Sequence, residues 1–249
     1  MLRKSIPSIL TMFSLLSGIT ALFFVFNTDF KSAMIAILVA AFFDFTDGFA
    51  ARLLHATSEF GVQLDSLSDM VSFGVVPAAA ATVFTASVIG LHDIDQVSLM
   101  RFIDLAVICL PLLIAVGSAL RLAKFNIDKN QKSHFIGLPT PANTLFVIAF
   151  ILFIKSQGAV FADNGMFLKG LLAVVFLFSA IMLVLPINLF ALKFKSFRFS
   201  ENWYRFLLLI AGLFALMFWG LKSFTVIIPF YIILSVILNI FSKESRLNG

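Results

Sequence analysis

The chain reads, from residue 36 to residue 76, AILVAAFFDFTDGFAARLLHATSEFGVQLDSLSDMVSFGVV. Two apolar runs flank a short polar link, and four aspartates interrupt them: Asp44, Asp47, Asp65 and Asp69. A carboxylate inside an apolar run is costly, so it indicates a functional site by default. The alternative is a helix-end residue wetted by lipid headgroups, which four aspartates at regular spacing disfavour.

The rest of the chain is as apolar as this stretch. Of its 249 residues, 61% are hydrophobic and 12% are charged, against about 45–50% and about 25% in soluble domains. A soluble core of this size could not bury so much apolar surface. The single cysteine, Cys109, excludes an internal disulfide and a multi-cysteine metal site. The composition therefore predicts an all-α polytopic membrane protein.

Eight stretches are apolar over nearly the length of about 20 residues that a helix needs to cross a bilayer. They are residues 6–26, 32–54, 62–91, 102–122, 141–155, 168–192, 206–221 and 224–241. We expect a single transmembrane helix bundle over 1–249, whose first run is a span and not a cleaved signal peptide. Eight crossings put both termini on one side, which then holds thirteen of the 18 lysines and arginines. Because positive residues stay in the cytosol, we expect cytosolic termini.

The spacing of the four aspartates predicts one site. Asp44 and Asp47 are three residues apart, and Asp65 and Asp69 are four apart, so each pair shares a helix face. The two helices run antiparallel on either side of residues 55–60, and Asp44 and Asp69 each lie about 14 Å from this link. The four carboxylates can therefore converge at two matched depths in the cytosolic half of the membrane.

Four clustered carboxylates repel one another in a low dielectric, and bound cations remove that repulsion. Carboxylate oxygens without His or Cys suit hard ions such as Mg²⁺, Mn²⁺ or Ca²⁺. A pair of divalent ions is the usual apparatus of phosphoryl transfer. The aspartates therefore predict a two-metal site.

Small residues accompany the acids. Gly48, Ala51 and Gly61 leave room for a ligand against the backbone, or serve close helix packing instead. Arg52, one turn after Gly48, can pair with a phosphate or act as a cytosolic anchor.

These residues form the pattern Asp44-x2-Asp47-Gly48-x2-Ala51-Arg52-x8-Gly61-x3-Asp65-x3-Asp69. The pattern matches the signature of the CDP-alcohol phosphatidyltransferases, and the chain resembles that family. Residues 64–77, 121–126 and 137–142 are similar to the integral-membrane phosphatidylserine synthases within it. Ser8 and Ser14 depart from the family, because asparagines are expected there.

The resemblance implies a donor, an acceptor and residue roles. The donor is CDP-diacylglycerol and the acceptor is L-serine, giving phosphatidylserine and CMP. Two ions of Mg²⁺ or Mn²⁺ are implied, as are a homodimer, no nucleic acid, and a prokaryotic inner or cytoplasmic membrane with a cytosol-facing site. Asp44, Asp47, Asp65 and Asp69 are the implied metal ligands, Asp69 is also the catalytic base, and Gly48, Ala51, Arg52 and Gly61 border the CDP group.

Arg121 and Lys124 are candidates for binding the carboxylate of the acceptor. They are three residues apart at the cytosolic end of the fourth span and share a face. Their alternative role is ordinary positive-inside flanking.

Other functions remain open from the residues alone. The same chemistry can act on glycerol 3-phosphate, inositol phosphate or choline, or on an ether-lipid donor. A cation transporter would also place carboxylates in the membrane, although no internal repeat accompanies them here.

Overall fold

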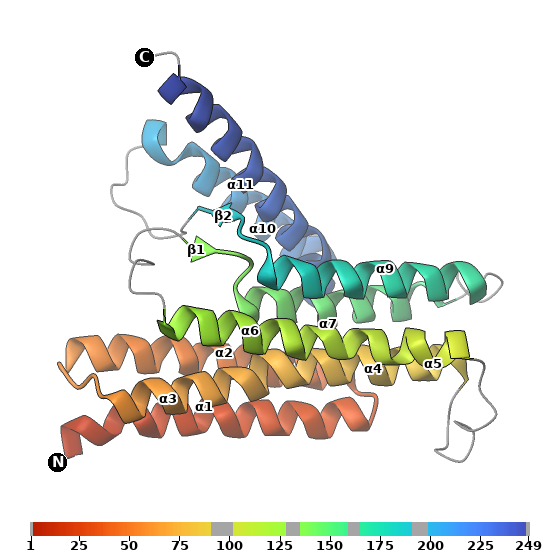
Figure 1. Ribbon diagram of the computed structural model, residues 1–249, viewed down its shortest axis with the longest axis horizontal. Helices are drawn as coiled ribbons and strands as arrows, with labels where there is room; N and C mark the ends of the chain where they lie inside the picture. The colour runs from red at the N-terminus through yellow and green to blue at the C-terminus, as the bar shows by residue number, and fades with distance from the viewer. Residues whose placement is uncertain (1, 91–101, 128–134, 159–164, 191–198, 248–249) are drawn as a thin grey trace.

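The computed structural model describes residues 2–90, 102–127, 135–158, 165–190 and 199–247, and these are mainly helical (Figure 1). The predicted all-α membrane fold is confirmed. The helices are α1 (Leu2–Phe26), α2 (Phe30–Leu53), α3 (Glu59–Asp69), η1 (Met70–Val75), α4 (Val76–Ile89), α5 (Phe102–Cys109), η3 (Leu110–Leu112), α6 (Leu113–Ile127), α7 (Thr140–Ser156), α9 (Gly165–Val184), α10 (Phe199–Trp219), η4 (Gly220–Ser223) and α11 (Phe224–Leu247). Two short strands, β1 (Phe135–Ile136) and β2 (Asn188–Leu189), pair antiparallel.

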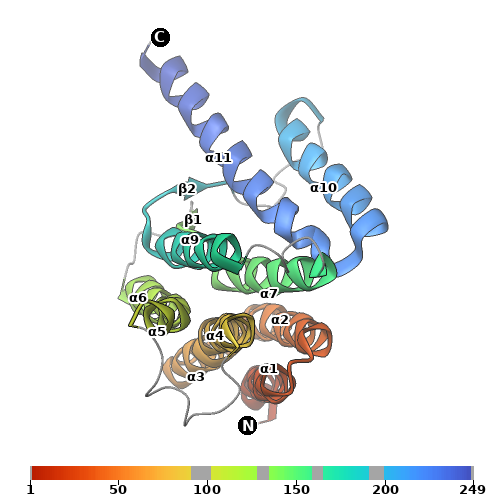
Figure 2. The ribbon, with the colours of Figure 1, turned by 90° about the vertical axis from the view of Figure 1, so that its right-hand side faces the viewer.

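Six helical stretches of the described residues are long and apolar enough to cross a membrane. They are Ser5–Phe26, Phe30–Leu53, Glu59–Ile89, Phe102–Ile127, Gly165–Val184 and Asn202–Ile240. The last stretch contains α10 and α11, which fold back on each other (Figure 2), and α7 is a shorter apolar helix. The count of about eight crossings and the cytosolic location of the termini stay predictions.

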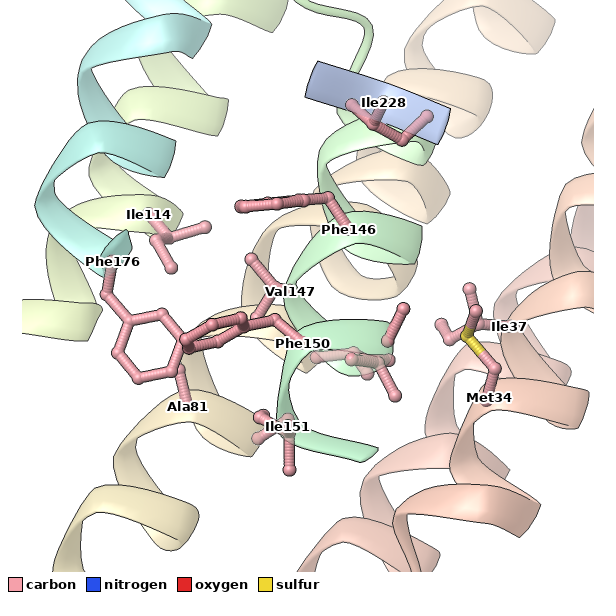
Figure 3. Close-up of a cluster of buried hydrophobic side chains, with 14 of the residues drawn as sticks. Met34, Ile37, Ala81, Ile114, Phe146, Val147, Phe150, Ile151, Phe176 and Ile228 are labelled. Carbon is pink, nitrogen blue, oxygen red and sulfur yellow. The ribbon is translucent and has the colours of Figure 1, made fainter. Parts of the chain in front are cut away.

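The helices form a bundle with α7 near its centre (Figure 2). Helix α7 packs on α2 and α4 on one side and on α9 and α11 on the other. The core residues labelled in Figure 3 come from these helices and from α6. Phe150 of α7, for example, meets the ring of Phe176 of α9 edge to face at 6.0 Å. Outer side chains such as Phe42 and Phe45 are exposed and apolar, as suits a lipid-facing surface.

Helix α9 ends earlier than the sequence suggests. The expected apolar span over residues 168–192 is wrong at its end, because the helix stops at Val184. Pro186 follows and has no backbone N–H to continue a helix. The chain joins β1 instead, and the N–H of Gly137 donates to the carbonyl of Ile187 at 2.8 Å.

The third apolar stretch is interrupted by the π-helix η1. Pro77 has no N–H to donate to the carbonyl of Phe73, four residues earlier. That oxygen accepts hydrogen bonds from the hydroxyls of Thr144 in α7, at 3.1 Å, and Ser118 in α6, at 3.5 Å. All three residues are fully buried. The carbonyl is therefore the point at which η1, α6 and α7 are tied together.

Helix α1 lies close to η1. A Cβ on Gly18 would come within 2.2 Å of Ser72 Oγ and 3.0 Å of Ser72 Cα. The Ser72 hydroxyl itself donates to the carbonyl of Ser14 at 3.4 Å, so it is not free to move aside without loss.

We expect Gly18→Ala to lower the free energy of unfolding by about 1–3 kcal/mol, the usual cost of overpacking. The measurement is thermal unfolding in detergent. Gly170→Ala is the control, because nothing lies within 4 Å of its Cβ position in α9. Equal melting temperatures for the two variants would contradict the close approach of α1 to η1.

Candidate active site

The four aspartates come together between α2 and α3. One carboxylate oxygen from each of Asp44, Asp47 and Asp65 lies within 4.8 Å of the others. Asp69 interacts electrostatically with all three, and Asp44 lies in hydrogen-bonding range of Asp65 and Asp69. The convergence expected from the spacing is therefore present.

The donor set suits a hard divalent cation. Asp47 is 5% exposed, and its Oδ2 is buried with no hydrogen-bond partner within the described ranges. Oδ1 of Asp69 is likewise buried with no hydrogen-bond partner among the described residues. Unpartnered buried carboxylate oxygens are costly, and ligation of a cation removes that cost. The cluster offers only oxygen ligands, as Mg²⁺, Mn²⁺ and Ca²⁺ prefer, so it can hold a metal ion.

The link between the two helices is tightly built. Helix α2 closes with the N–H of Ala56 donating to the carbonyl of Ala51 at 2.9 Å. Ser58 then caps α3, because its hydroxyl accepts from the N–H of Gly61 at 3.0 Å. His55 has a positive φ of 50°, which lets the chain reverse within this link. The short link holds the two aspartate faces opposite each other.

Helix α1 supports the site from behind. The Thr11 hydroxyl lies in hydrogen-bonding range of the Asp47 carboxylate, and it also donates to the carbonyl of Pro7 at 3.0 Å. Ser68, next to Asp69, donates to the carbonyl of Thr11 at 3.4 Å. These contacts fix the positions of α2 and α3 along the axis of α1.

The small residues differ in what surrounds them. A Cβ on Gly61 would lie 3.1 Å from Ser58 Oγ, so the helix cap gives this glycine a packing reason. A Cβ on Gly48 would meet nothing within 4 Å. Ala51 is half-buried, and the exposed Arg52 donates from Nε to the carbonyl of Gly48 at 3.0 Å. The space beside Gly48 is therefore open to a ligand.

A hollow of about 610 Å³ opens at the same end of the molecule. Its lining comes from the link and from the first turns of α3: Thr57, Ser58, Glu59, Phe60, Val62 and Gln63. It thus adjoins Gly61 and the N-terminus of α3.

Arg121 and Lys124 do not share an environment. Arg121 is half-buried and interacts electrostatically with Asp69, and its Nε has no hydrogen-bond partner among the residues the structure describes. Lys124 is exposed. Asn126, one turn beyond Leu122, donates to the Ser66 hydroxyl at 2.9 Å and so holds the end of α6 against α3. The structure therefore brings Arg121 to the aspartates and leaves Lys124 at the surface.

The first turn of α7 adds polar groups that the spacing analysis did not assign to the site. Thr140 is 1% exposed and Asn143 is fully buried. The only signal in the sequence was the rigid stretch over residues 137–142, with Pro139 and Pro141.

Comparisons with known proteins identify the family of the chain. The family model for CDP-alcohol phosphatidyltransferase matches residues 4–185. The chain is 34% identical over 136 residues to a CDP-diacylglycerol–serine O-phosphatidyltransferase of Bacillus subtilis, covering 55% of this chain and 69% of that protein. It is 37% identical over 153 residues to the protein of that name in Methanocaldococcus jannaschii, covering 58% and 67%.

A third relative extends the match along this chain. The protein of the same name in Mycobacterium tuberculosis is 32% identical over 171 residues, which cover 66% of this chain and 54% of that protein. The chain thus spans between about half and about two thirds of the length of these three relatives.

Proposed function

The chain belongs to the CDP-alcohol phosphatidyltransferase family, and on that premise we propose that it transfers the phosphatidyl group of CDP-diacylglycerol to the hydroxyl of L-serine. The products are phosphatidylserine and CMP. The observation that carries the proposal is the aspartate cluster, with Asp47 buried and the guanidinium of Arg121 beside Asp69. The names of the three relatives support serine as the acceptor.

The aspartates have divided roles in this proposal. Asp44, Asp47 and Asp65, completed by Asp69, would hold divalent metal, Mg²⁺ or Mn²⁺ and two ions. When bound, the metal neutralises the charge of the pyrophosphate and makes its phosphorus easier to attack. Gly48, Ala51, Arg52 and Gly61 border the CDP portion, where the open space beside Gly48 admits the ligand.

Asp69 is the base of the reaction. Its unpartnered Oδ1 accepts the proton of the serine hydroxyl as the hydroxyl oxygen attacks the phosphorus that bears diacylglycerol. The bond from that phosphorus to the bridging oxygen breaks, and CMP leaves with its charge paired in part by Arg52. The transfer depends on positioning and electrostatics, so it needs no covalent enzyme intermediate.

The acceptor side favours a small amino acid over a phosphorylated alcohol. Glycerol 3-phosphate or inositol phosphate calls for a dense basic pocket, but among the described residues the candidate cations beside the cluster reduce to Arg121, since Lys124 is exposed. Choline would leave the guanidinium without an anion. A carboxylate-bearing acceptor such as serine pairs with one guanidinium.

The cellular setting follows from the same proposal. We place the protein in a prokaryotic cytoplasmic membrane with the site facing the cytosol, where serine and CMP are soluble. The start of α1 and the α2–α3 link lie at the same end of the molecule (Figure 1), as this orientation requires. A homodimer is also part of the proposal.

The test is CMP release by the purified protein from CDP-diacylglycerol in mixed micelles. We expect release that requires both L-serine and Mg²⁺ or Mn²⁺, with phosphatidylserine formed in equal amount. Glycerol 3-phosphate, inositol phosphate and choline are tested in place of serine. If one of these alcohols drives CMP release and serine does not, that alcohol is the acceptor in place of serine. If neither serine nor any of these alcohols drives release, the transferase proposal is refuted.

We expect Gly48→Val to raise the KM for CDP-diacylglycerol by about tenfold or more, since a loss of about 1.4 kcal/mol of binding energy is tenfold in affinity. Nothing lies within 4 Å of a Cβ at this position, so the added side chain enters space that the ligand would occupy. Thermal unfolding is measured in parallel. Gly170→Val, near the start of α9, is the matched control, because nothing lies within 4 Å of its Cβ position either. An unchanged KM would show that the donor does not occupy this space.

A further inference from the structure

Three helices meet at the carbonyl of Phe73, and their order along the membrane axis can be followed from that point. Helices α3 and α7 both run from the end with the α2–α3 link toward the opposite end, whereas α6 runs the other way (Figure 1). Thr144 of α7 and Ser118 of α6 both donate to this carbonyl. This carbonyl therefore marks a common depth for η1, α6 and α7.

One turn from this point, on the side of the aspartate cluster, each element presents a polar side chain. Asp69 precedes Phe73 by four residues, Arg121 follows Ser118 by three, and Thr140 precedes Thr144 by four. At about 1.5 Å per residue, all three lie about 4.5–6 Å from the meeting point. Residues three or four apart share a helix face, so Arg121 and Thr140 lie on the faces of α6 and α7 that meet at this carbonyl. Arg121 is also close enough to Asp69 to interact with it electrostatically.

Each of these side chains has a polar atom that is buried and unpartnered within the described part of the chain. The atoms are Oδ1 of Asp69, Nε of Arg121 and Oγ1 of Thr140. Thr140 is the most enclosed, at 1% exposed. Its hydroxyl does not cap α7, because Pro139 holds the N-cap position and no side-chain cap bond is made.

The buried threonines Thr11, Thr85 and Thr144 donate to backbone carbonyls, and Thr144 donates to two. The Oγ1 atoms of Thr82 in α4 and Thr225 in α11 lack a partner among the described residues, as that of Thr140 does. Leaving a buried hydroxyl without a partner costs free energy. Thr140 is thus a buried polar group whose partner is expected to come from outside the described protein atoms.

We propose that Thr140 is a specificity-determining residue that binds the ammonium group of the acceptor amino acid. L-Serine carries a hydroxyl, an ammonium and a carboxylate on adjacent carbons, so its recognition needs three partners from different directions. Asp69 faces the hydroxyl and Arg121 pairs with the carboxylate, and both assignments rest on the proposed function. The Thr140 oxygen supplies the remaining need, a neutral acceptor for N–H donors.

The placement on α7 explains why this partner is neutral. A fifth carboxylate would bind an ammonium more strongly, but it would add to the charge of the aspartate cluster. A threonine hydroxyl accepts a hydrogen bond without adding charge. Discrimination arises because an acceptor lacking the ammonium leaves the buried hydroxyl unpaired.

The experiment measures the KM and kcat for L-serine in Thr140→Val, which keeps the volume of the side chain and removes the hydroxyl. We expect the KM to rise about tenfold or more, as for a lost hydrogen bond to a charged group, with kcat within about twofold. Thr140→Ser restores the hydroxyl and is expected to restore the KM. Thr85→Val is the matched control and leaves both constants unchanged.

Two competitive inhibitors that each lack one group of serine show which group Thr140 binds. 3-Hydroxypropionate lacks the ammonium of serine, and ethanolamine lacks the carboxylate. We expect Thr140→Val to leave the inhibition constant of 3-hydroxypropionate unchanged and to weaken ethanolamine. Equal weakening of both competitors, or an unchanged KM for serine, would overturn the proposal.

The outcomes separate this inference from the function on which it rests. If the unmodified protein releases no CMP with serine, the proposed function fails before any variant is compared. If serine-dependent release occurs and Thr140→Val matches the unmodified protein, only the role of Thr140 is lost. Should Thr140→Val unfold at a lower temperature, Thr140→Cys makes the same comparison, because a thiol is close in size and a weak acceptor.

Discussion

Asp69→Asn is expected to lower kcat by about a thousandfold, within the range of about 10²–10⁴ that a positioned base contributes. Asparagine keeps the shape of the side chain but cannot take the proton of the attacking hydroxyl. Because burial and the neighbouring Asp44, Asp47 and Asp65 all oppose a charged carboxylate at this position, thermal stability without added metal should not fall. Steady-state CMP release and thermal unfolding in detergent measure the two quantities.

Glu59→Gln is the matched control for Asp69→Asn. It makes the same change from carboxylate to amide on α3, at an exposed position in its first turn, and we expect normal turnover. Full activity in Asp69→Asn would remove the assignment of this residue as the base. A loss of activity together with early unfolding would instead indicate a structural role for its carboxylate.

Asp47→Asn is expected to abolish the dependence of stability on divalent metal. A ligand that binds only the folded protein stabilises it by about 2.7 kcal/mol when present at about 100 times its Kd. Mg²⁺ or Mn²⁺ should therefore raise the melting temperature of the unmodified protein, and a chelator should reverse the rise. The buried carboxylate of Asp47 is central to the oxygen cluster, so the variant should show no such rise.

The same variant should lose more than about a hundredfold in turnover, because even indirect partners of a metal cost about 10–100-fold when removed. Asp29→Asn tests the specificity of the effect. Asp29 caps the opposite end of the same helix, where it accepts from the N–H of Ser32 at 3.1 Å, and asparagine caps equally well. A metal-dependent rise that persists in Asp47→Asn would place the ion elsewhere.

The aspartate cluster could be predicted from the sequence because its geometry is local. Asp44 and Asp47 share one helix, Asp65 and Asp69 share the next, and the link between them is short. Helical periodicity then fixes which faces meet. The same reasoning gave the helical membrane class, since apolar runs of spanning length have few other solutions.

The acceptor side could not be resolved in the same way. Arg121 and Lys124 are both cations near the end of one helix, and spacing alone places them on a shared face. Their environments differ because Arg121 is half-buried next to Asp69, whereas Lys124 is exposed, where Asn126 and Ser66 join α6 to α3. Such tertiary contacts join residues about 60 positions apart and leave no local pattern.

The end of α9 and the burial of the first turn of α7 could not be predicted from the sequence either, because both depend on tertiary contacts. Pro186 marks the end of α9, but only its pairing partner, β1, shows where the chain goes next. Thr140 follows a proline, so the sequence places it in the loop before the fifth apolar run. Its burial depends on the packing of α7 at the centre of the bundle.

The π-helix η1 has a consequence for how the third span is wound. A π-turn is equivalent to one residue inserted into an α-helix, and one residue corresponds to a rotation of about 100°. The half that carries Asp65 and Asp69 is therefore out of rotational phase with the half that carries Ala80 and Phe84. Deleting one residue from Met70–Val75 would rewind the span into a single phase, and the carboxylates would then turn away from Asp44 while α4 kept its place in the core.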